Sequence, residues 1–228
     1  MLLQGKVVAV TGAFGALGSA VVKACLAEGG KVAAIDRAVS PRDPLGTAEL
    51  FGSVDLAKEM GARTTMDVII AKLGQIDALV NIAGGFRWET VAKGSLDTWD
   101  QLYQLNLRTV VSACRAAIPL LPDNHGRIVN IGANGAVKAG AGMGAYAASK
   151  AGVARLTEAL AEELKERGIT VNAVLPSIID TPANRNDMPK ADFDTWVKPQ
   201  QLADVIVFLL SAKAQAITGA LLPVTGRV

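Results

Sequence analysis

The residues best suited to chemistry in this chain are a tyrosine and a lysine four positions apart, Tyr146 and Lys150. The alanine-rich stretch around them predicts a helix, and residues four apart share one helical face. A free phenol has a pKa of about 10, too high for ready proton exchange at neutral pH. A nearby ammonium favours the phenolate, so we expect Lys150 to lower the pKa of Tyr146. Such a pair suits general acid–base work on a carbonyl or imine that accepts a hydride, although the same spacing also occurs in solvated helix pairs.

A glycine-rich turn near the N-terminus is the second informative feature. A short β-branched stretch runs into the turn, and a helix opens where the turn ends. Backbone N–H groups at such a turn converge on one point, and the helix N-terminus adds about half a positive charge there. The pattern predicts a pyrophosphate cradle, and therefore a dinucleotide site, formed by Gly12, Phe14, Gly15, Ala16, Leu17 and Gly18.

Carboxylates at the ends of the next two expected strands bear on the choice of dinucleotide. Asp36 lies 18 residues after Gly18, where a carboxylate accepts hydrogen bonds from a ribose and repels a 2′-phosphate. Arg37 argues for NADP(H), but Phe14 brings no cation from the turn. We therefore expect NAD(H), with NADP(H) as the alternative. Asp55 ends the third strand, where it suits either an adenine contact or the N-cap of the following helix.

Two asparagines fall at positions with special backbone or helical surroundings. Asn81 opens the run Asn81-x-Ala83-Gly84 at the end of the fourth strand. The glycine lets the backbone pass close to a ribose, or simply makes a tight turn. Asn106 lies inside an apolar helical pattern, where asparagine has a poor propensity. It has either a functional role or a hydrogen bond to neighbouring backbone.

The bulk composition excludes several classes of function. The chain has 228 residues, 50% hydrophobic, enough for one domain with a large core. With 23 basic and 21 acidic residues, it offers no electrostatic case for binding nucleic acid. It contains no signal-peptide pattern and no apolar run of about 18 residues. The two cysteines, Cys25 and Cys114, favour packed thiols in the cytoplasm. The single histidine, His125, lies in a turn-like stretch and excludes a multi-histidine metal site, so we expect no metal.

Strands and helices alternate along the whole chain. Strands are expected at Lys6–Thr11, Lys31–Asp36, Phe51–Val54, Ala78–Ala83, Arg127–Gly132, Thr170–Leu175 and Leu221–Val224. Helices are expected at Gly18–Glu28, Ala57–Leu73, Leu96–Leu120, Ala145–Arg167 and Gln200–Ser211. This order predicts one α/β domain over residues 1–228, a doubly wound Rossmann-type parallel sheet of seven strands with helices on both faces. The long segment Pro176–Pro199 has little periodicity, which is typical of a functional loop.

These motifs together resemble the short-chain dehydrogenase/reductase family over nearly the whole chain. The turn from Thr11 to Gly18 is similar to the family's cofactor turn. The run Asn81-x-Ala83-Gly84 is similar to the family's fourth-strand motif. Three members of the family's catalytic tetrad are matched by Asn106, Tyr146 and Lys150.

The resemblance also implies roles for individual residues. It implies that Lys150 holds the nicotinamide ribose and that Asn106 anchors a proton-relay water. The stretch from Pro176 through Ile179 to Thr181 resembles the segment that holds the nicotinamide carboxamide in members of the family.

Two positions depart from the family pattern. Ala16 replaces the middle glycine of the turn, and Ala133 stands where the family has its tetrad serine, thirteen residues before Tyr146. Alanine cannot hydrogen-bond a developing alkoxide, and the loss of one such donor costs about 3–4 kcal/mol of transition-state stabilisation. Substitute donors are Asn134, Ser177 and Asn184.

The dihydropteridine reductases resemble this chain in the same departures, in a short second crossover and in the late loop. Their substrate is a quinonoid pterin, for which a tyrosine alone is a sufficient donor. Phe86 and Trp88, just after the fourth strand, suit stacking on a flat ring, or packing in a lid or interface.

Our first hypothesis is an NADH-dependent oxidoreductase that transfers a hydride between nicotinamide and a small carbonyl, alcohol or imine, with Tyr146 as general acid and base. Reduction of quinonoid dihydropterin is the alternative. A dinucleotide sensor without catalysis is a further alternative, motivated by the missing serine. The resemblance implies a homodimer or homotetramer through the helices at 96–120 and 145–167, with a small-molecule substrate. From the charge balance and the lack of a long apolar run, we expect neither nucleic acid nor membrane as a partner.

Overall fold

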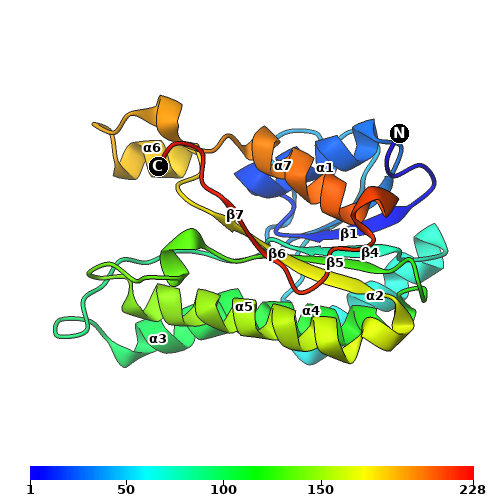
Figure 1. Cartoon of the computed structure of the whole chain (residues 1–228), viewed down its shortest axis with the longest axis horizontal. Helices are drawn as coiled ribbons and strands as arrows, with labels where there is room; N and C mark the ends of the chain where they lie inside the picture. Colours follow the sequence, from blue (N-terminus) through cyan, green and yellow to red (C-terminus); the bar gives the residue numbers. More distant parts are fainter.

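The computed structural model describes residues 1–228 and contains one seven-stranded sheet, with helices on both of its faces (Figure 1). The strand order is β3-β2-β1-β4-β5-β6-β7, and every neighbouring pair is parallel. The strands are β1 (Val7–Thr11), β2 (Lys31–Ile35), β3 (Glu49–Phe51), β4 (Ala78–Asn81), β5 (Arg127–Ile131), β6 (Thr170–Pro176) and β7 (Leu221–Val224). The doubly wound α/β fold predicted from the sequence is confirmed.

Each face of the sheet carries its own helices and its own apolar core. The helices are α1 (Ala16–Ala27), α2 (Glu59–Leu73), α3 (Leu96–Tyr103), α4 (Thr109–Ala117), α5 (Gly144–Glu163), α6 (Pro182–Asp187) and α7 (Pro199–Leu210). Helices α1 and α7 cover one face, while α2, α4 and α5 cover the other (Figure 1). Alternate residues of β1 serve the two cores, because Val8 and Val10 belong to the first and Ala9 to the second. Strands covered on both faces need continuous apolar runs, which explains their composition.

The third strand differs from its prediction. It was expected at Phe51–Val54 but spans Glu49–Phe51, so only Phe51 is shared. A Cβ at Gly52 would lie 2.0 Å from the Val39 carbonyl oxygen, and Ser53 has a positive φ of 61°. The backbone therefore turns at these two residues, and a strand cannot continue through them.

The helical run at 96–120 is not one regular helix. It consists of α3, a π-helical turn at Gln104–Arg108, α4 and a 3-10 turn at Ile118–Leu120. A π turn holds one residue more than an α-helical path of the same length, and such turns are frequent at functional sites. The late segment, expected to be irregular, contains α6 and a 3-10 turn at Phe193–Thr195.

Several predictions about single residues are confirmed. Cys25 and Cys114 are free and buried, and burial raises the pKa of each thiol to about 12. His125 is exposed in its turn. None of the helices combines the length and the apolar character needed to cross a bilayer.

Candidate active site

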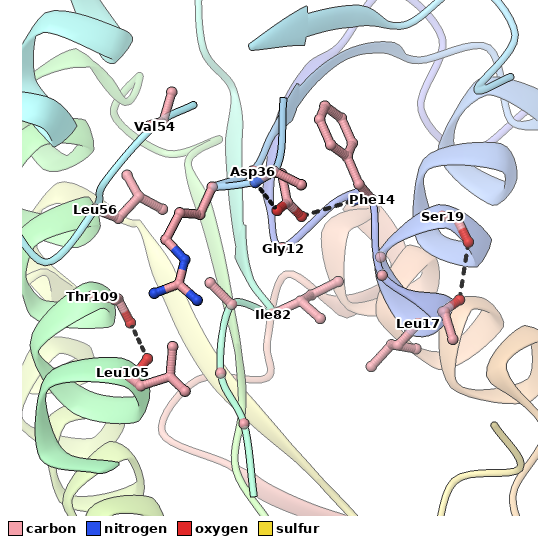
Figure 2. Close-up of a pocket in the computed structure, with 18 of the residues that line it drawn as sticks. Gly12, Phe14, Leu17, Ser19, Asp36, Val54, Leu56, Ile82, Leu105 and Thr109 are labelled. Carbon is pink, nitrogen blue, oxygen red and sulfur yellow. Dashed lines mark hydrogen bonds between the residues drawn. The ribbon is translucent and has the colours of Figure 1, made fainter. Parts of the chain in front are cut away.

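A cleft of about 1330 Å³ opens at the carboxyl ends of β1, β2 and β4 (Figure 2). The strand order reverses between β1 and β4, and ligands of open α/β sheets bind at such a point. The volume exceeds the roughly 300–1,000 Å³ of ordinary small-molecule pockets, as an extended dinucleotide requires. Most predicted cofactor residues line this cleft: Gly12, Phe14, Gly15, Ala16, Leu17, Gly18, Asp36, Asp55, Ala83, Gly84 and Thr181.

The glycine turn has the geometry of an anion cradle. Gly12 has a φ of 63°, and a Cβ there would lie 2.7 Å from the backbone nitrogen of Ala83. A Cβ at Gly18 would lie 2.0 Å from the carbonyl oxygen of Gly12. Helix α1 begins at Ala16 with no side-chain cap, so its first-turn N–H groups remain available to a ligand. Because Ala16 is already helical, its methyl group is accommodated, and the turn fits a pyrophosphate.

Asp36 is tied to the glycine turn by its own carboxylate. Its oxygens accept hydrogen bonds from the backbone nitrogens of Phe14, at 3.0 Å, and Ala38, at 2.9 Å (Figure 2). The side chain thus holds the end of β2 against the turn and also borders the cleft. Two arginines, Arg37 and Arg42, line the same region. Arg42 was missed from the sequence, because it lies in an irregular crossover with no motif around it.

Asp55 lines the cleft without capping the helix that follows. Its carboxylate accepts from the backbone nitrogen of Ala57 at 3.1 Å and lies 3.6 Å from the Lys58 ammonium. Helix α2 begins at Glu59 with Lys58 as its N-cap residue. The N-cap interpretation of Asp55 is therefore wrong, and the adenine contact stays a prediction.

Five predicted cofactor residues do not line the cleft: Asn81, Tyr146, Lys150, Pro176 and Ile179. The Asn81 side chain is 2% exposed and donates to Asn130 Oδ1 at 2.9 Å and to Cys114 Sγ at 3.4 Å, toward α4. It therefore joins β4 to β5 and α4. The Ile179 carbonyl accepts a hydrogen bond from Asn184 Nδ2 at 2.7 Å.

Thr11, at the end of β1, has a positioning role that the sequence motif did not reveal. Its hydroxyl oxygen accepts hydrogen bonds from the backbone nitrogens of Ile82, at 3.0 Å, and Ala83, at 3.2 Å. This contact fastens the segment after β4 to the glycine turn. Thr11 is the first residue of the Thr11–Gly18 turn, and this place in the motif is the only sequence feature that points to its role.

Asn106 lies in the π turn and is fully buried. Its Oδ1 accepts from the Gly85 backbone nitrogen at 2.7 Å, and its Nδ2 donates to the Gly85 carbonyl at 3.0 Å and to Ser149 Oγ at 3.0 Å. Ser149 Oγ in turn donates to the Tyr146 carbonyl at 2.7 Å. The backbone-bonded alternative for Asn106 is therefore observed. Its side chain ties the segment after β4 to α5.

Lys150 lies on α5 outside the cleft lining, beside Gly84, which lines the cleft. Its buried Nζ donates to the Ile131 carbonyl at 2.7 Å, and a Cβ at Gly84 would lie 3.4 Å from the same nitrogen. Tyr146 is half-buried one helical turn earlier. Lys150 and Gly84 thus join the reacting pair to the cleft.

The acidities differ from the expectation. Burial raises the pKa of Tyr146 to about 12 and lowers the pKa of Lys150 to about 8. The expected lowering of the Tyr146 pKa is absent, because burial disfavours both charged forms. Within the protein alone Tyr146 keeps its proton, as a general acid must.

A methyl group, that of Ala133, occupies the position of the family's tetrad serine. Ala133 is 6% exposed, just after β5. Of the three proposed substitutes, Ser177 donates to the Thr225 carbonyl at 2.7 Å, and Asn184 to Ile179. Asn134, which is half-buried beside Ala133, remains the nearest candidate donor.

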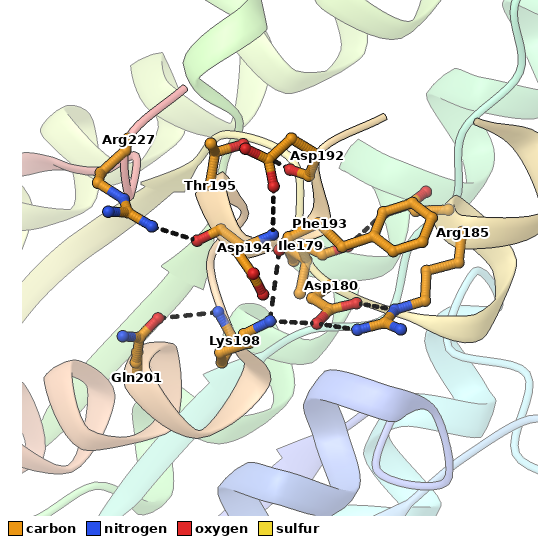
Figure 3. Close-up of polar contacts among 11 residues, drawn as sticks. Ile179, Asp180, Arg185, Asp192, Phe193, Asp194, Thr195, Lys198, Gln201 and Arg227 are labelled. Carbon is orange, nitrogen blue, oxygen red and sulfur yellow. Dashed lines mark hydrogen bonds and ion pairs between the residues drawn. The ribbon is translucent and has the colours of Figure 1, made fainter. Parts of the chain in front are cut away.

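A charged cluster fastens the segment at residues 177–198, which we call the α6 segment (Figure 3). The Asp180 side chain is 8% exposed, and its carboxylate accepts from Arg185 at 2.8 Å and from Lys198 at 2.7 Å. Both cations hold the Asp180 pKa well below its usual range. The Arg185 guanidinium also lies 4.6 Å from the centre of the Phe193 ring. The neighbouring Thr181 borders the cleft and caps α6 by accepting from the Asn184 backbone nitrogen.

The last residues of the chain also contact the α6 segment (Figure 3). The Arg227 guanidinium donates to the Asp194 carbonyl at 2.9 Å, and the Arg227 backbone nitrogen donates to the Thr195 carbonyl at 3.0 Å. The segment is therefore held by the strand β7 extension as well as by its own ion pairs.

Comparisons with known proteins agree with this geometry. A sequence profile for short chain dehydrogenases matches residues 6–192. The 3-oxoacyl-(acyl-carrier-protein) reductase FabG of Thermotoga maritima is 32% identical over 242 residues, covering 99% of this chain and 98% of that protein. Nodulation protein G of Azospirillum brasilense is 33% identical, covering 98% of each chain.

Solved structures lead to the same family. A short-chain dehydrogenase/reductase from Serratia marcescens superposes with a TM-score of 0.91 and 30% identity, covering 99% of this chain and 98% of that one. A blue fluorescent protein from a metagenomic library, in complex with NADPH, superposes with a TM-score of 0.89 and 32% identity over the same shares. This chain belongs to the short-chain dehydrogenase family. It is accordingly an oxidoreductase of the class that uses a nicotinamide dinucleotide.

Proposed function

We propose that this protein is an NADH-dependent oxidoreductase that acts on a small carbonyl, alcohol or imine. The observation that carries the proposal is the placement of Lys150 Nζ beside Gly84, a residue that lines the cleft, with Tyr146 one turn away on α5. This arrangement sets a proton donor next to the site where the reactive end of a dinucleotide belongs.

The chain's own residues hold and supply the proton. When bound, the nicotinamide cofactor supplies the hydride. Burial raises the pKa of Tyr146 to about 12, so the phenol is protonated at neutral pH and has a proton to give to the substrate oxygen or nitrogen. Lys150 offers its ammonium to the cofactor ribose. Asn106 holds the segment after β4 at a fixed position against α5.

The preference for NADH rests on Asp36. Its carboxylate is fixed at the cleft by two backbone N–H groups, and a fixed negative charge at this position disfavours a 2′-phosphate. Arg37 and Arg42 line the same region and favour NADPH as the second candidate, as does the structural relative solved with NADPH. Titration with NADH and NADPH in parallel decides between them, and tighter binding of NADPH would contradict the proposal.

The test of the proposed chemistry is the Tyr146→Phe substitution. We expect turnover to fall by at least about 100-fold, as expected for loss of a general acid, while NADH binds as in the wild type. NADH affinity is measured by fluorescence titration and turnover by NADH absorbance with a set of carbonyls and imines. Undiminished turnover in Y146F would refute the role of Tyr146. Tight NADH binding by the wild type, with no NADH oxidation by any substrate of the set, would favour the alternative of a dinucleotide sensor without catalysis.

Reduction of a quinonoid dihydropterin is the second candidate. The observation that favours it is Ala133, a buried methyl group where a second hydrogen-bond donor would otherwise stand. A conjugated ring system that takes up a hydride needs less oxyanion stabilisation than an isolated ketone does. Including quinonoid dihydropterin in the substrate set separates the two candidates by their kcat/KM values.

We also propose assembly through α3 and α5. Leu96, Trp99 and Tyr103 on α3 are 82%, 39% and 47% exposed, and Trp99 and Tyr103 border a hollow of about 240 Å³ together with Ala145 and Ala148 of α5. A second copy covering this surface accounts for its apolar character. Sedimentation velocity should report a dimer or tetramer, and a monomer at micromolar concentration would refute the proposal.

A further inference from the structure

Phe86 both packs on the proposed proton donor and is exposed to solvent. Its ring packs edge-to-face on Tyr146, with ring centres 4.9 Å apart and planes at 80°. It nevertheless remains 56% exposed. Part of this ring is therefore open to solvent beside the proposed proton donor.

The backbone before Phe86 is fixed by the network that also fixes Tyr146. Asn106 binds both polar atoms of the Gly85 backbone and passes a hydrogen bond to Ser149, which donates to the Tyr146 carbonyl. The backbone segments that carry the Phe86 and Tyr146 rings are therefore tied to each other by hydrogen bonds.

The backbone after Phe86 is fixed as well. Trp88 Nε1 donates to the Ala141 carbonyl at 2.9 Å, and the Glu89 backbone nitrogen donates to the Gly142 carbonyl at 2.8 Å. Gly142 has a φ of 74°, and a Cβ there would lie 2.1 Å from the Trp88 indole. Phe86 thus stands between two anchored positions, so its exposed ring is presented on a rigid segment.

A substrate of the proposed reaction must lie next to this ring. A substrate atom that takes a proton from Tyr146 comes within hydrogen-bond distance of the phenol oxygen, and hence close to the ring that packs on that phenol. Ala133 contributes a buried methyl group in place of a hydroxyl. On the loops near this end of α5, Trp88 and Val137 are 60% and 76% exposed.

We propose that Phe86 is a specificity-determining residue, which selects substrates whose reactive carbon carries a flat conjugated ring. The inference rests on the proposed function, because it takes Tyr146 as the proton donor. A rigid aromatic wall binds a planar ring by stacking, beyond what burial of the same apolar area gives, and it loses little freedom when it does so. Aryl ketones and quinonoid heterocycles belong to this class, and open-chain aliphatic carbonyls do not.

The test compares an aromatic ketone with its saturated counterpart. Phenyl methyl ketone and cyclohexyl methyl ketone have the same carbon count, and kcat/KM is measured for both with wild type, Phe86→Leu and Phe86→Trp. Phe193→Leu is the matched control, because its ring packs on Trp196 and Arg185 in the α6 segment. Dissociation constants of benzamide and cyclohexanecarboxamide are measured by calorimetry in the presence of NADH, which reports binding without turnover.

We expect F86L to lower the preference for the phenyl ketone by about two- to tenfold, the size of an aromatic pair contribution. F86W and F193L should keep the wild-type preference, and the two amides should follow the ketones. An equal loss for both ketones in F86L overturns the inference, as does a change in assembly state with an unchanged ratio. If the wild type reduces no substrate of any kind, the proposed function fails, and the amide comparison still decides whether Phe86 selects flat rings.

Discussion

Replacement of Asn106 by alanine probes the contact that holds the reacting end together. The side chain is completely buried and makes three hydrogen bonds. Its removal leaves the Gly85 N–H without an acceptor, which costs about 1–3 kcal/mol, and removes two further bonds of about 0.5–1.5 kcal/mol each. We therefore expect N106A to lose about 2–6 kcal/mol of unfolding free energy. For a chain of this size, this corresponds to a Tm lower by about 4–24 °C.

The assay is thermal unfolding by circular dichroism, followed by kinetics on the folded fraction. Asn186, an exposed residue of α6, provides the matched control, and N186A should change the unfolding free energy by no more than about 0.5 kcal/mol. Because Asn106 ties the segment after β4 to Tyr146, kcat should fall in N106A by a larger factor than NADH affinity does.

N106D gives a second measurement on the same contacts. The carboxylate would face the Gly85 carbonyl oxygen, so a protonated carboxyl is favoured and its pKa rises above the unfolded value. The folded state then binds more protons than the unfolded state, and stability relative to wild type should increase as the pH falls from about 7 to 5. An unchanged Tm in N106A, or no pH response in N106D, would refute the reasoning.

Three more outcomes follow from the described contacts. In Gly18→Ala the new methyl group would lie 2.0 Å from a backbone carbonyl, so Tm and NADH binding should both fall, whereas Gly15→Ala, with its only contact at 3.5 Å, should keep its Tm; equal thermal shifts would contradict this. Asp180→Asn loosens the charged cluster that fastens the α6 segment beside the cleft, so it should raise KM for NADH more than it lowers kcat. Asp187→Asn is the neutral control on the same segment. An unchanged KM in D180N would show that the charged cluster does not support NADH binding. Burial lowers the pKa of Lys150 to about 8, so kcat/KM for reduction should fall as the pH rises above about 8 and the ammonium loses its charge, and a flat profile from pH 7 to 9.5 would oppose that role.

The features that could be predicted from the sequence are those set by local pattern. Gly12 and Gly18 stand in the turn because side chains there would collide with backbone, and that requirement is visible in the sequence spacing. Asp36 could be predicted at the cleft because the carboxyl ends of neighbouring parallel strands lie at the same edge of the sheet, which places the end of β2 beside the glycine turn. The alternation of apolar runs and amphipathic stretches likewise predicts the parallel sheet.

The features that could not be predicted depend on contacts between distant segments. The pKa of Tyr146 is raised by burial, which depends on how the segment after β4 folds over α5. Asn106, in the π turn, bonds to Gly85, which is 21 residues away in sequence. Asn81 faces Asn130 and Cys114 in this structure, and the orientation of a buried side chain at a strand end cannot be read from its motif.

The contact of Arg227 with the α6 segment bears on how the protein should be handled. A purification tag attached beyond Val228 would compete with the bonds that Arg227 makes to Asp194 and Thr195. Met1 is 84% exposed at the opposite end of the molecule (Figure 1), so a fusion there leaves those bonds undisturbed. Affinities for dinucleotides measured on differently tagged preparations should therefore be compared only when the tag is on the same side.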